Sequence, residues 1–269
     1  MFIRSFLKWP GGKYRVLSRL LSVFPQGKRF VEPFVGSGTV FLNTQYREYL
    51  LCDVNHDLID TFTVLTKTPE RFITSCQKLF TAKNNTPERY YALRSAFNNA
   101  ASSLERAVLF LYCNRHCYNG LVRYNSKGAF NVPFGRYVAP YFPEREMRLF
   151  HKKYTACAVT FAVQEFAQTF AHARTGDVFY CDPPYVPLTP TSNFTAYAGK
   201  AFTMREQHAL ALCAKQAAHA GIPVILSNHD TQDTQKLYGG AQIHTFPVRR
   251  SISCAARGMA GELAAVYTG

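Results

Sequence analysis

Short apolar runs that end in polar residues recur along the chain and predict β-strands. Four of them cover residues 29–32, 49–53, 177–182 and 222–228. Helical patterns lie between most of these runs, which is typical of α/β proteins with a largely parallel sheet. Thr203 and Glu206 form a capping box, so a helix is predicted from there to about residue 220. Residues 242–249 and 262–268 are rich in β-formers and predict an antiparallel pair that closes the sheet.

The alternation of strands and helices stops between about residues 56 and 165. Helical patterns there occupy roughly residues 57–80, 87–99 and 103–117. A turn-rich segment, residues 118–154, follows them. From Arg115 to Lys153 the chain holds eight Arg or Lys, two Glu and no Asp, among eight Tyr or Phe. We therefore expect residues 57–159 to form an inserted binding subdomain, and residues 1–56 and 160–269 to form the sheet domain.

Composition narrows the class of partner. The chain has 269 residues, 47% of them hydrophobic and 18% charged, which excludes an intrinsically disordered protein. Lys and Arg total 31 against 17 Asp and Glu, a net charge of +14 that favours a polyanion such as nucleic acid. A merely basic surface is the alternative.

Three further features bear on location and metal binding. The chain contains no apolar run of about 18 residues, so we expect no membrane span. Its eight cysteines lack the spacing of a disulfide framework, as expected in the cytoplasm. Cys113 and Cys117 have no second pair at zinc spacing, so we interpret them as buried thiols and expect no metal.

The first motif that can carry chemistry is FVEPFVGSGTV, residues 30–40. A strand ends at Glu32, and Gly36 and Gly38 let the chain turn and approach a ligand before a helix begins. An ordinary βα turn would show the same two glycines. Asp53 ends the next strand-like run, where a carboxylate can accept hydrogen bonds from both hydroxyls of a ribose. Together these residues predict a nucleoside-bearing ligand at the carboxyl edge of the sheet.

The second motif is Asp182-Pro183-Pro184-Tyr185, directly after an apolar strand. Two prolines fix the backbone, so that the Asp182 carboxylate and the Pro183 carbonyl can converge on one NH2 group. Tyr185 offers a flat face on which a base can stack. A strand terminator with a capping aspartate is the alternative interpretation.

The third motif is FLKWPGGK, residues 6–13. Two glycines followed by Lys13, ahead of a helical stretch, offer backbone donors and a cation to a carboxylate or a phosphate. A turn with a solvated lysine is the alternative. The motif lacks the residues of a complete Walker A loop, which disfavours phosphate cleavage.

Taken in order, these motifs carry a family resemblance. The chain resembles the Dam-type DNA adenine-N6 methyltransferases of bacteria and phages from Phe6 to Tyr267. The matching motifs are FLKWPGGK, FVEPFVGSGTVFLN, DVNHDLI, NRHCYNGLVRYN, NVPFGRY, DPPY and SNHD.

The resemblance implies a fold, a reaction and a cofactor. The fold would be a Rossmann-like methyltransferase sheet, mostly parallel, with an inserted, mainly helical DNA-recognition subdomain that contains a β-hairpin. The reaction would transfer a methyl group from S-adenosylmethionine to adenine N6, within GATC, after the base is flipped out of double-stranded DNA. The catalytic residues would be Asp182, Pro183, Pro184 and Tyr185. The cofactor residues would be Trp9, Lys13, Glu32, Pro33, Phe34, Gly36, Ser37, Gly38, Asp53 and Asp182.

The resemblance also assigns DNA contacts. Arg123 is suited to bidentate reading of a guanine edge. Lys8 resembles the family's contact to the first guanine, and Tyr137 resembles a further contact. Leu121 and Pro133 would touch a thymine methyl, and Tyr118 and Asn119 would fill the gap left by the adenine. The proposed phosphate contacts are Arg94, Arg115, Asn125, Asn131 and Arg136. Such contacts position a protein on DNA without specifying sequence.

Two other interpretations stay open at this point. The same motif would suit methylation of RNA or of a glutamine amide, although those enzymes usually carry Asn in place of Asp182. The protein could also be a DNA-binding regulator without activity, but such a protein has no use for a cofactor site. We expect a monomer in the bacterial cytoplasm or in a phage-infected cell.

Overall fold

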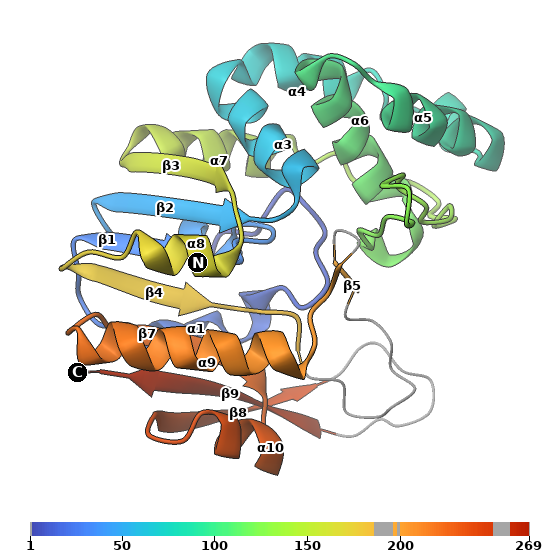
Figure 1. Cartoon of the computed structure of the whole chain (residues 1–269). Helices are drawn as coiled ribbons and strands as arrows, with labels where there is room; N and C mark the ends of the chain where they lie inside the picture. The colour runs from blue at the N-terminus through green and yellow to red at the C-terminus, as the bar shows by residue number, and fades with distance from the viewer. Residues whose placement is uncertain (1, 186–195, 198–199, 250–258, 269) are drawn as a thin grey trace.

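The computed structural model describes residues 2–185, 196–197, 200–249 and 259–268. A seven-stranded sheet with the order β3-β2-β1-β4-β7-β9-β8 forms its centre (Figure 1). The strands are β1 (Arg29–Glu32), β2 (Glu48–Asp53), β3 (Ala158–Val163), β4 (Asp177–Cys181), β7 (Val224–His229), β8 (Gln242–Arg249) and β9 (Met259–Tyr267), beside a small separate pair, β5 (Ala196–Tyr197) and β6 (Lys200–Ala201). The five neighbouring strands β3, β2, β1, β4 and β7 are parallel, whereas β9 is antiparallel to both of its neighbours, β7 and β8. The α/β class, the mostly parallel sheet and the antiparallel C-terminal strands are therefore confirmed.

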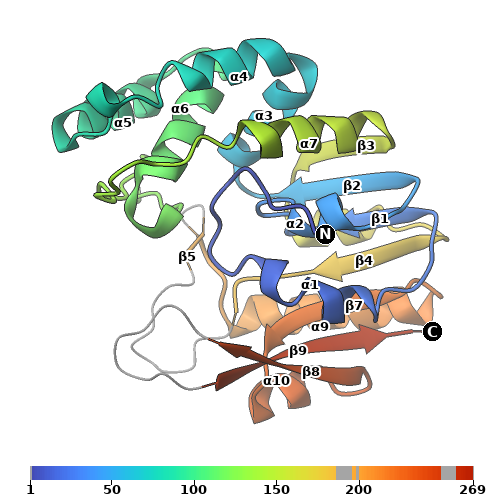
Figure 2. The ribbon, with the colours of Figure 1, turned by 180° about the vertical axis from the view of Figure 1, so that it is seen from behind.

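Helices cover both faces of the sheet. One face carries α1 (Leu17–Leu21), α2 (Thr39–Asn43), α3 (His56–Lys67) and α7 (Glu144–Thr155), several of which stand in front in Figure 2. The other carries α8 (Phe166–Ala171), α9 (Met204–His219) and α10 (Gln232–Leu237). Each face of the sheet packs on its helices through its own hydrophobic core. Because side chains alternate along a strand, Phe30 of β1 lies in the core on the α1 face and Val31 lies in the core on the α9 face.

A helical lobe extends beyond β3, above the carboxyl ends of the strands (Figure 1). It contains α4 (Pro69–Gln77), α5 (Pro87–Asn99) and α6 (Ser103–His116), where helices were predicted. The predicted helix over residues 57–80 is two helices, because Pro69 cannot continue α3 and instead opens α4. Side-chain caps start the others: Thr86 accepts from the Arg89 amide and Ser102 from the Glu105 amide.

The structure corrects three expectations for residues 118–163. Residues 144–155 form α7, where turns were expected. Residues 158–163 form β3, where no strand was predicted. In place of the expected β-hairpin, the described residues form two isolated antiparallel bridges, Cys117–Phe134 and Tyr124–Phe130. The division of the chain at residues 57 and 159 stays a prediction.

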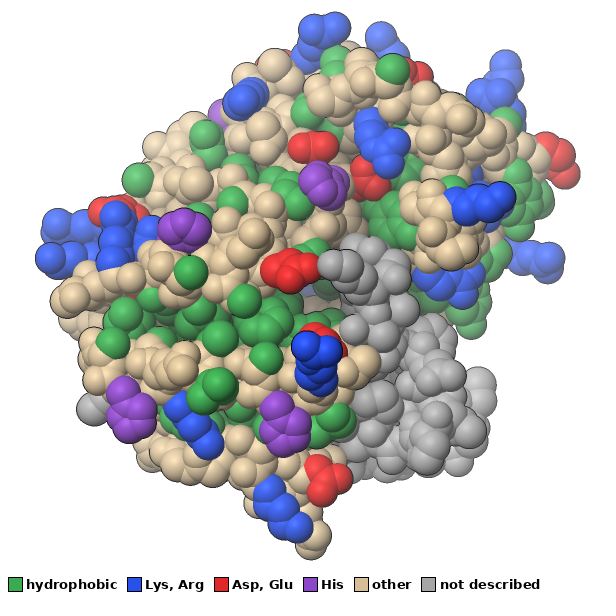
Figure 3. All heavy atoms as spheres, in the orientation of Figure 1, with side chains coloured by type: hydrophobic (Ala, Val, Ile, Leu, Met, Phe, Trp, Pro, Cys, Tyr) green, Lys and Arg blue, Asp and Glu red, His purple; other side chains and the backbone are tan. Residues whose placement is uncertain are grey.

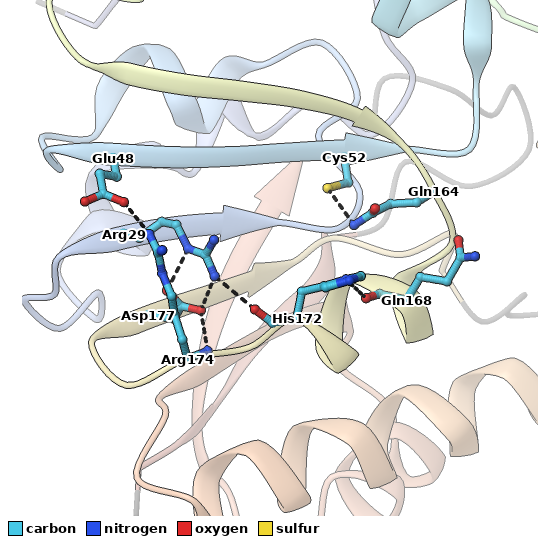
Figure 4. Close-up of polar contacts among 8 residues, drawn as sticks. All are labelled: Arg29, Glu48, Cys52, Gln164, Gln168, His172, Arg174 and Asp177. Carbon is cyan, nitrogen blue, oxygen red and sulfur yellow. Dashed lines mark hydrogen bonds and ion pairs between the residues drawn. The ribbon is translucent and has the colours of Figure 1, made fainter.

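The amino ends of the strands are joined by a buried ion pair (Figure 4). Arg29, at the start of β1, donates to both carboxylate oxygens of Asp177, at the start of β4, at 2.8 and 2.6 Å. Asp177 is 1% exposed and also accepts from the Arg174 amide at 2.9 Å. Arg174 in turn pairs with Glu48, which opens β2. Three strands are thereby held together at this end of the sheet.

Two simpler findings complete the fold. Within the described residues, no helix has both the length and the apolarity needed to cross a membrane. The seven cysteines in the described part of the chain are all free thiols, and Cys113 and Cys117 are both buried.

Candidate active site and nucleic-acid interface

The topology brings the predicted motifs to one edge of the sheet. From β1 the chain continues to β2 and β3 on one side, whereas β4 lies on the other side of β1. In open α/β sheets, ligands bind outside the carboxyl ends of the strands where the order reverses in this way. Glu32 ends β1, Asp53 ends β2 and Asp182 follows β4. All three carboxylates therefore stand at the reversal point or beside it.

The glycine turn after β1 is shaped for close approach. Gly36 and Gly38 have φ values of +48° and +71°, which favour glycine. A Cβ atom on Gly36 would lie 2.9 Å from the Trp9 ring nitrogen, so the turn and the Trp9 loop are in direct contact. The Gly36 amide donates to Asp53 at 3.1 Å, and the Ser37 carbonyl accepts from Ser5 at 2.6 Å. The first and third motifs thus form one structure.

Aromatic rings lie beside this turn. Pro33 is buried, and the half-buried Phe34 ring stacks on Phe166 at 5.8 Å and meets Phe202 edge-on at 5.7 Å. Apolar side chains next to carboxylates are the usual lining of a small-molecule site.

Burial makes the three carboxylates unusually weak acids. It raises the pKa of Asp182 from 3.8 to about 6, and that of Asp53 from 3.8 to about 6. Burial, with the charge of Asp182 nearby, raises the pKa of Glu32 well above its ordinary value. Glu32 Oε2 and Asp182 Oδ1 are buried and have no hydrogen-bond partner among the described residues. Buried oxygens in this state suit a ligand that brings donors or positive charge.

Lys13 has a partner that the sequence did not suggest. Its side chain is 4% exposed, and Nζ lies 2.9 Å from Asp182 Oδ2 and 4.7 Å from the centre of the Tyr185 ring. Nζ also donates to the Gly11 carbonyl at 2.6 Å. The positive charge of Lys13 stabilises the ionised form of Asp182, and its contact with a cofactor stays a prediction.

Two residues near the Asp-Pro-Pro-Tyr turn were missed. Gln207, 1% exposed in α9, donates to the Pro184 carbonyl at 2.7 Å. Glu262 of β9 accepts from the Tyr185 hydroxyl at 3.4 Å. The sequence held a signal for Gln207, because it is a polar residue on the helix face that also carries the buried Leu210.

The groups at this edge fit a nucleoside-bearing cofactor with a positive charge. Asp53 offers a carboxylate to ribose hydroxyls, and the glycine turn admits a ligand close to the backbone. Among the residues that the structure describes, Glu32 Oε2 and Asp182 Oδ1 have no hydrogen-bond partner, so both can act as acceptors at this edge of the sheet.

The first group of predicted DNA contacts assembles around Lys8. Its backbone forms two hydrogen bonds with the side-chain amide of the buried Asn114, at 2.8 and 2.7 Å. Its Nζ lies 3.8 Å from the centre of the Tyr137 ring, and the Tyr137 hydroxyl accepts from the Asn119 amide at 3.0 Å. A Cβ atom on Gly120 would lie 2.3 Å from that of Lys8. The structure therefore brings Lys8, Asn119 and Tyr137 together.

The second group surrounds Arg123, which is exposed. Its Nε donates to the side chain of Asn131 at 2.8 Å, and the Asn131 amide donates back to the Arg123 carbonyl at 3.1 Å. The Tyr118 amide donates to the Pro133 carbonyl at 2.8 Å, and Leu121 is half-buried. The guanidinium of Arg123 is thus held at the surface by a second predicted contact residue.

The remaining predicted contacts differ in exposure. Arg115 is 9% exposed and donates to the Tyr141 carbonyl, and the half-buried Arg94 donates to the Val132 carbonyl at 2.9 Å. The Asn125 side chain accepts from two amides of its own turn, and Arg136 is exposed. On the face shown in Figure 3, Lys and Arg side chains are scattered over the helical lobe.

Comparisons with known proteins agree with this arrangement. The model of the D12 class N6 adenine-specific DNA methyltransferases matches residues 9–252. A DNA adenine methylase of Vibrio cholerae is 46% identical over 268 residues, covering 98% of this chain and 96% of the relative. That of Escherichia coli K12 is 46% identical over 266 residues, covering 98% and 95%. Among solved structures, a precorrin 8w decarboxylase of Methanobacterium thermoautotrophicum superposes with a TM-score of 0.40 and 12% identity, over 100% of this chain and 96% of that one.

Proposed function

The chain belongs to the D12 class of N6 adenine-specific DNA methyltransferases, and on that premise we propose that it methylates a flipped-out adenine within GATC in double-stranded DNA. The class uses S-adenosylmethionine. Because its members methylate adenine in DNA, we no longer consider RNA or a glutamine amide as the substrate. The observation that carries the proposal is the pair Asp182–Lys13 at the reversal point of the sheet, with Asp182 Oδ1 unpartnered among the described residues.

When bound, S-adenosylmethionine supplies an activated methyl group on a positively charged sulfur. We assign cofactor binding to the Trp9 loop, to the carboxylates at this edge of the sheet and to the glycine turn. The full set is Trp9, Lys13, Glu32, Pro33, Phe34, Gly36, Ser37, Gly38, Asp53 and Asp182. Asp53 binds the ribose hydroxyls, and the negative charge at this edge favours the sulfonium.

The catalytic work falls to Asp182, Pro183, Pro184 and Tyr185. An exocyclic adenine amine is a poor nucleophile, because its lone pair is delocalised into the ring. Asp182 Oδ1 and the Pro183 carbonyl accept hydrogen bonds from N6 and orient it toward the methyl group. Lys13 keeps Asp182 ionised for this task. Tyr185 stacks on the flipped base, and Gln207 holds the turn through the Pro184 carbonyl.

Sequence recognition is assigned to the surface of the inserted region. Arg123 reads a guanine, and its guanidinium is held by Asn131 at 2.8 Å. Lys8, which precedes the inserted region in the chain, contacts the first guanine, and Tyr137 beside it makes a further contact. Tyr118 and Asn119 fill the gap left by the adenine. Leu121 and Pro133 touch a thymine methyl. Phosphate contacts are assigned to Arg94, Arg115, Asn125, Asn131 and Arg136. We further assign recognition to residues 57–159 of a monomer in the bacterial cytoplasm.

The test distinguishes the recognition of DNA sequence from general affinity for DNA. Arg123→Ala should lose its preference for GATC over single-base variants, because a bidentate guanine contact is worth about 1–3 kcal/mol against the wrong base. Arg136→Ala is the matched control and should weaken all sequences alike, with a salt slope lower by about one unit. Methylation of GATC and variant duplexes across a salt series measures both effects. If Arg123→Ala slows every substrate equally, Arg123 binds phosphate and the guanine reader is another residue.

A further inference from the structure

The turn that carries Arg123 is tied through a buried carboxylate, Asp57, to helix α3, which covers one face of the sheet. Asp57 lies in the first turn of α3 and is 5% exposed. Its Oδ1 is 2.5 Å from Arg106 Nε of α6, and its Oδ2 accepts from the Tyr124 hydroxyl at 2.6 Å. Three segments that are distant in the sequence therefore meet at one carboxylate.

Tyr124 is the contact from the recognition side. Its neighbours Arg123 and Asn125 are exposed, whereas Tyr124 is half-buried, with its ring edge-on to Phe130 at 5.8 Å. Tyr124 and Phe130 also form one of the antiparallel bridges of this turn. The hydroxyl at the far end of Tyr124 thus connects the backbone next to Arg123 with α3.

Asp57 is joined just as closely to the cofactor edge. Only Val54, Asn55 and His56 separate it from Asp53, and the Asn55 amide donates to Asp53 Oδ1 at 3.0 Å. The Asn55 side chain caps α3 by accepting from the Leu58 amide at 3.1 Å. Asn55 therefore links the first turn of α3, which contains Asp57, to Asp53 by hydrogen bonds.

The charges of Asp57 and Arg106 strengthen the hydrogen bond between Tyr124 and Asp57. Asp57 sits at a helix N-terminus, where a negative charge is stabilised, and faces the Arg106 cation. Burial and the charge of Asp57 raise the pKa of Tyr124 well above its ordinary value, so its hydroxyl keeps its proton and donates. A hydrogen bond to an ionised acceptor is stronger than a neutral one.

We propose that Asp57, through Tyr124, is a positioning residue for sequence discrimination, which sets the Arg123 turn at a fixed place relative to the cofactor edge. Bidentate reading of a base needs placement within about half an ångström, so a loosened turn loses discrimination before it loses affinity. The inference rests on the proposed reading of DNA bases by this turn.

The central variant is Tyr124→Phe, which removes the hydroxyl and keeps the ring on Phe130. The ratio of kcat/KM for GATC over single-base variants should fall about five- to tenfold, less than the full effect of a lost hydrogen bond to a charged acceptor, because Tyr124 acts on base reading only through the position of the turn. Binding of non-specific DNA and of S-adenosylmethionine should stay within about twofold. Tyr46→Phe is the matched control, because its half-buried hydroxyl donates to the Pro25 carbonyl at 2.6 Å, away from this site. It should leave the ratio unchanged.

A double-mutant cycle with Asp57→Asn sharpens the test. If the hydroxyl acts through the Asp57 charge, Tyr124→Phe should have less than half its effect in the Asp57→Asn background. An unchanged ratio in Tyr124→Phe, or fully additive effects in the cycle, would overturn the inference.

Arg123→Ala, measured in parallel, separates this inference from the proposed function. If Arg123→Ala loses discrimination while Tyr124→Phe keeps it, only the role of Asp57 is wrong. If Arg123→Ala keeps discrimination while Tyr124→Phe loses it, the role of Asp57 stands and another residue of the turn reads the base.

Discussion

The two ends of the central sheet treat buried charge in opposite ways. At the amino ends, Asp177 accepts hydrogen bonds from two guanidinium nitrogens of Arg29 and from the backbone amide of Arg174 (Figure 4). At the carboxyl ends, Glu32 and Asp182 stand close enough that the charge of Asp182 raises the pKa of Glu32. Each of them keeps a buried oxygen without a partner in the described part of the chain. The same strands, β1 and β4, carry both arrangements.

The difference separates a structural charge from a functional one. A buried charge is costly unless hydrogen bonds and an opposite charge offset that cost. The pair Arg29–Asp177 meets both conditions within the fold, so a ligand would add nothing there. At the carboxyl ends, the desolvation of Glu32 and Asp182 is only partly offset within the fold, so a bound ligand can offset the rest. Enzymes commonly sacrifice stability at such sites.

The largest expected effect comes from the functional end. Asp182→Ala should lower the single-turnover rate of methyl transfer about 100-fold or more, because N6 is no longer oriented. The affinity for DNA should change little, whereas the fold should lose some stability, because the buried Lys13 loses its ion-pair partner. Rapid-quench measurement on a GATC duplex tests this. A variant that kept more than a few per cent of the wild-type rate would show that Asp182 has another role.

The matching change at the structural end should act on stability alone. Asp177→Ala leaves Arg29 partly buried and unpaired, which should lower the free energy of unfolding by about 3–5 kcal/mol. Denaturant titration measures the loss, and active-site titration should show near-normal turnover for each folded molecule. A stability close to wild type would mean that the pair contributes little to the fold.

Asp53→Ala should have an intermediate effect, seen mainly as weaker cofactor binding. Each lost hydrogen bond to this charged acceptor should weaken S-adenosylmethionine binding by about 1.5–3 kcal/mol. Turnover should recover substantially at saturating cofactor. Isothermal titration calorimetry that found an unchanged dissociation constant would remove Asp53 from the cofactor site.

The smallest effect should appear on changing the pH. Asp53 and Asp182 have raised pKa values of about 6 against 3.8, so between pH 6 and 4 the folded chain binds protons that the unfolded chain does not. Their contribution to the free energy of unfolding therefore increases as the pH falls through this window. Methyl transfer should decline over the same range, because protonated Asp182 is a poor acceptor for N6. The variant with both Asp53→Asn and Asp182→Asn should show a flatter stability profile, and an unaltered profile would contradict these assignments.

Local sequence patterns predicted the sheet and its ligand edge well. Strand β1 and strand β8 have the predicted bounds, and the glycine turn begins where Glu32 ends the first strand. Such features depend on neighbouring residues, whose alternation and turn chemistry are visible in the chain itself.

The missed elements have two different explanations. The sequence of strand β3, AVTFAV, is rich in β-formers, but it lies inside the region where we expected the alternation of strands and helices to stop. Helix α7 buries only Met147 and Phe150 among many charged residues, and its apolar face is too narrow to stand out.

The missed contacts are those set by topology. Lys13 and Asp182, or Tyr124 and Asp57, lie far apart in sequence and meet only because of the strand order and the packing of α3 and α6. No local pattern contains this information. The contact residues assigned by resemblance, such as Arg123 and Lys8, were placed by motif alone and stay predictions.

The contact between Trp9 and Gly36 has a spectroscopic consequence. Trp9 is the single tryptophan of the chain, and its indole lies against the turn at the cofactor edge. The tryptophan fluorescence of the whole protein therefore reports on this one loop. Without any label, the enzyme carries its own optical probe at the site where a cofactor would arrive.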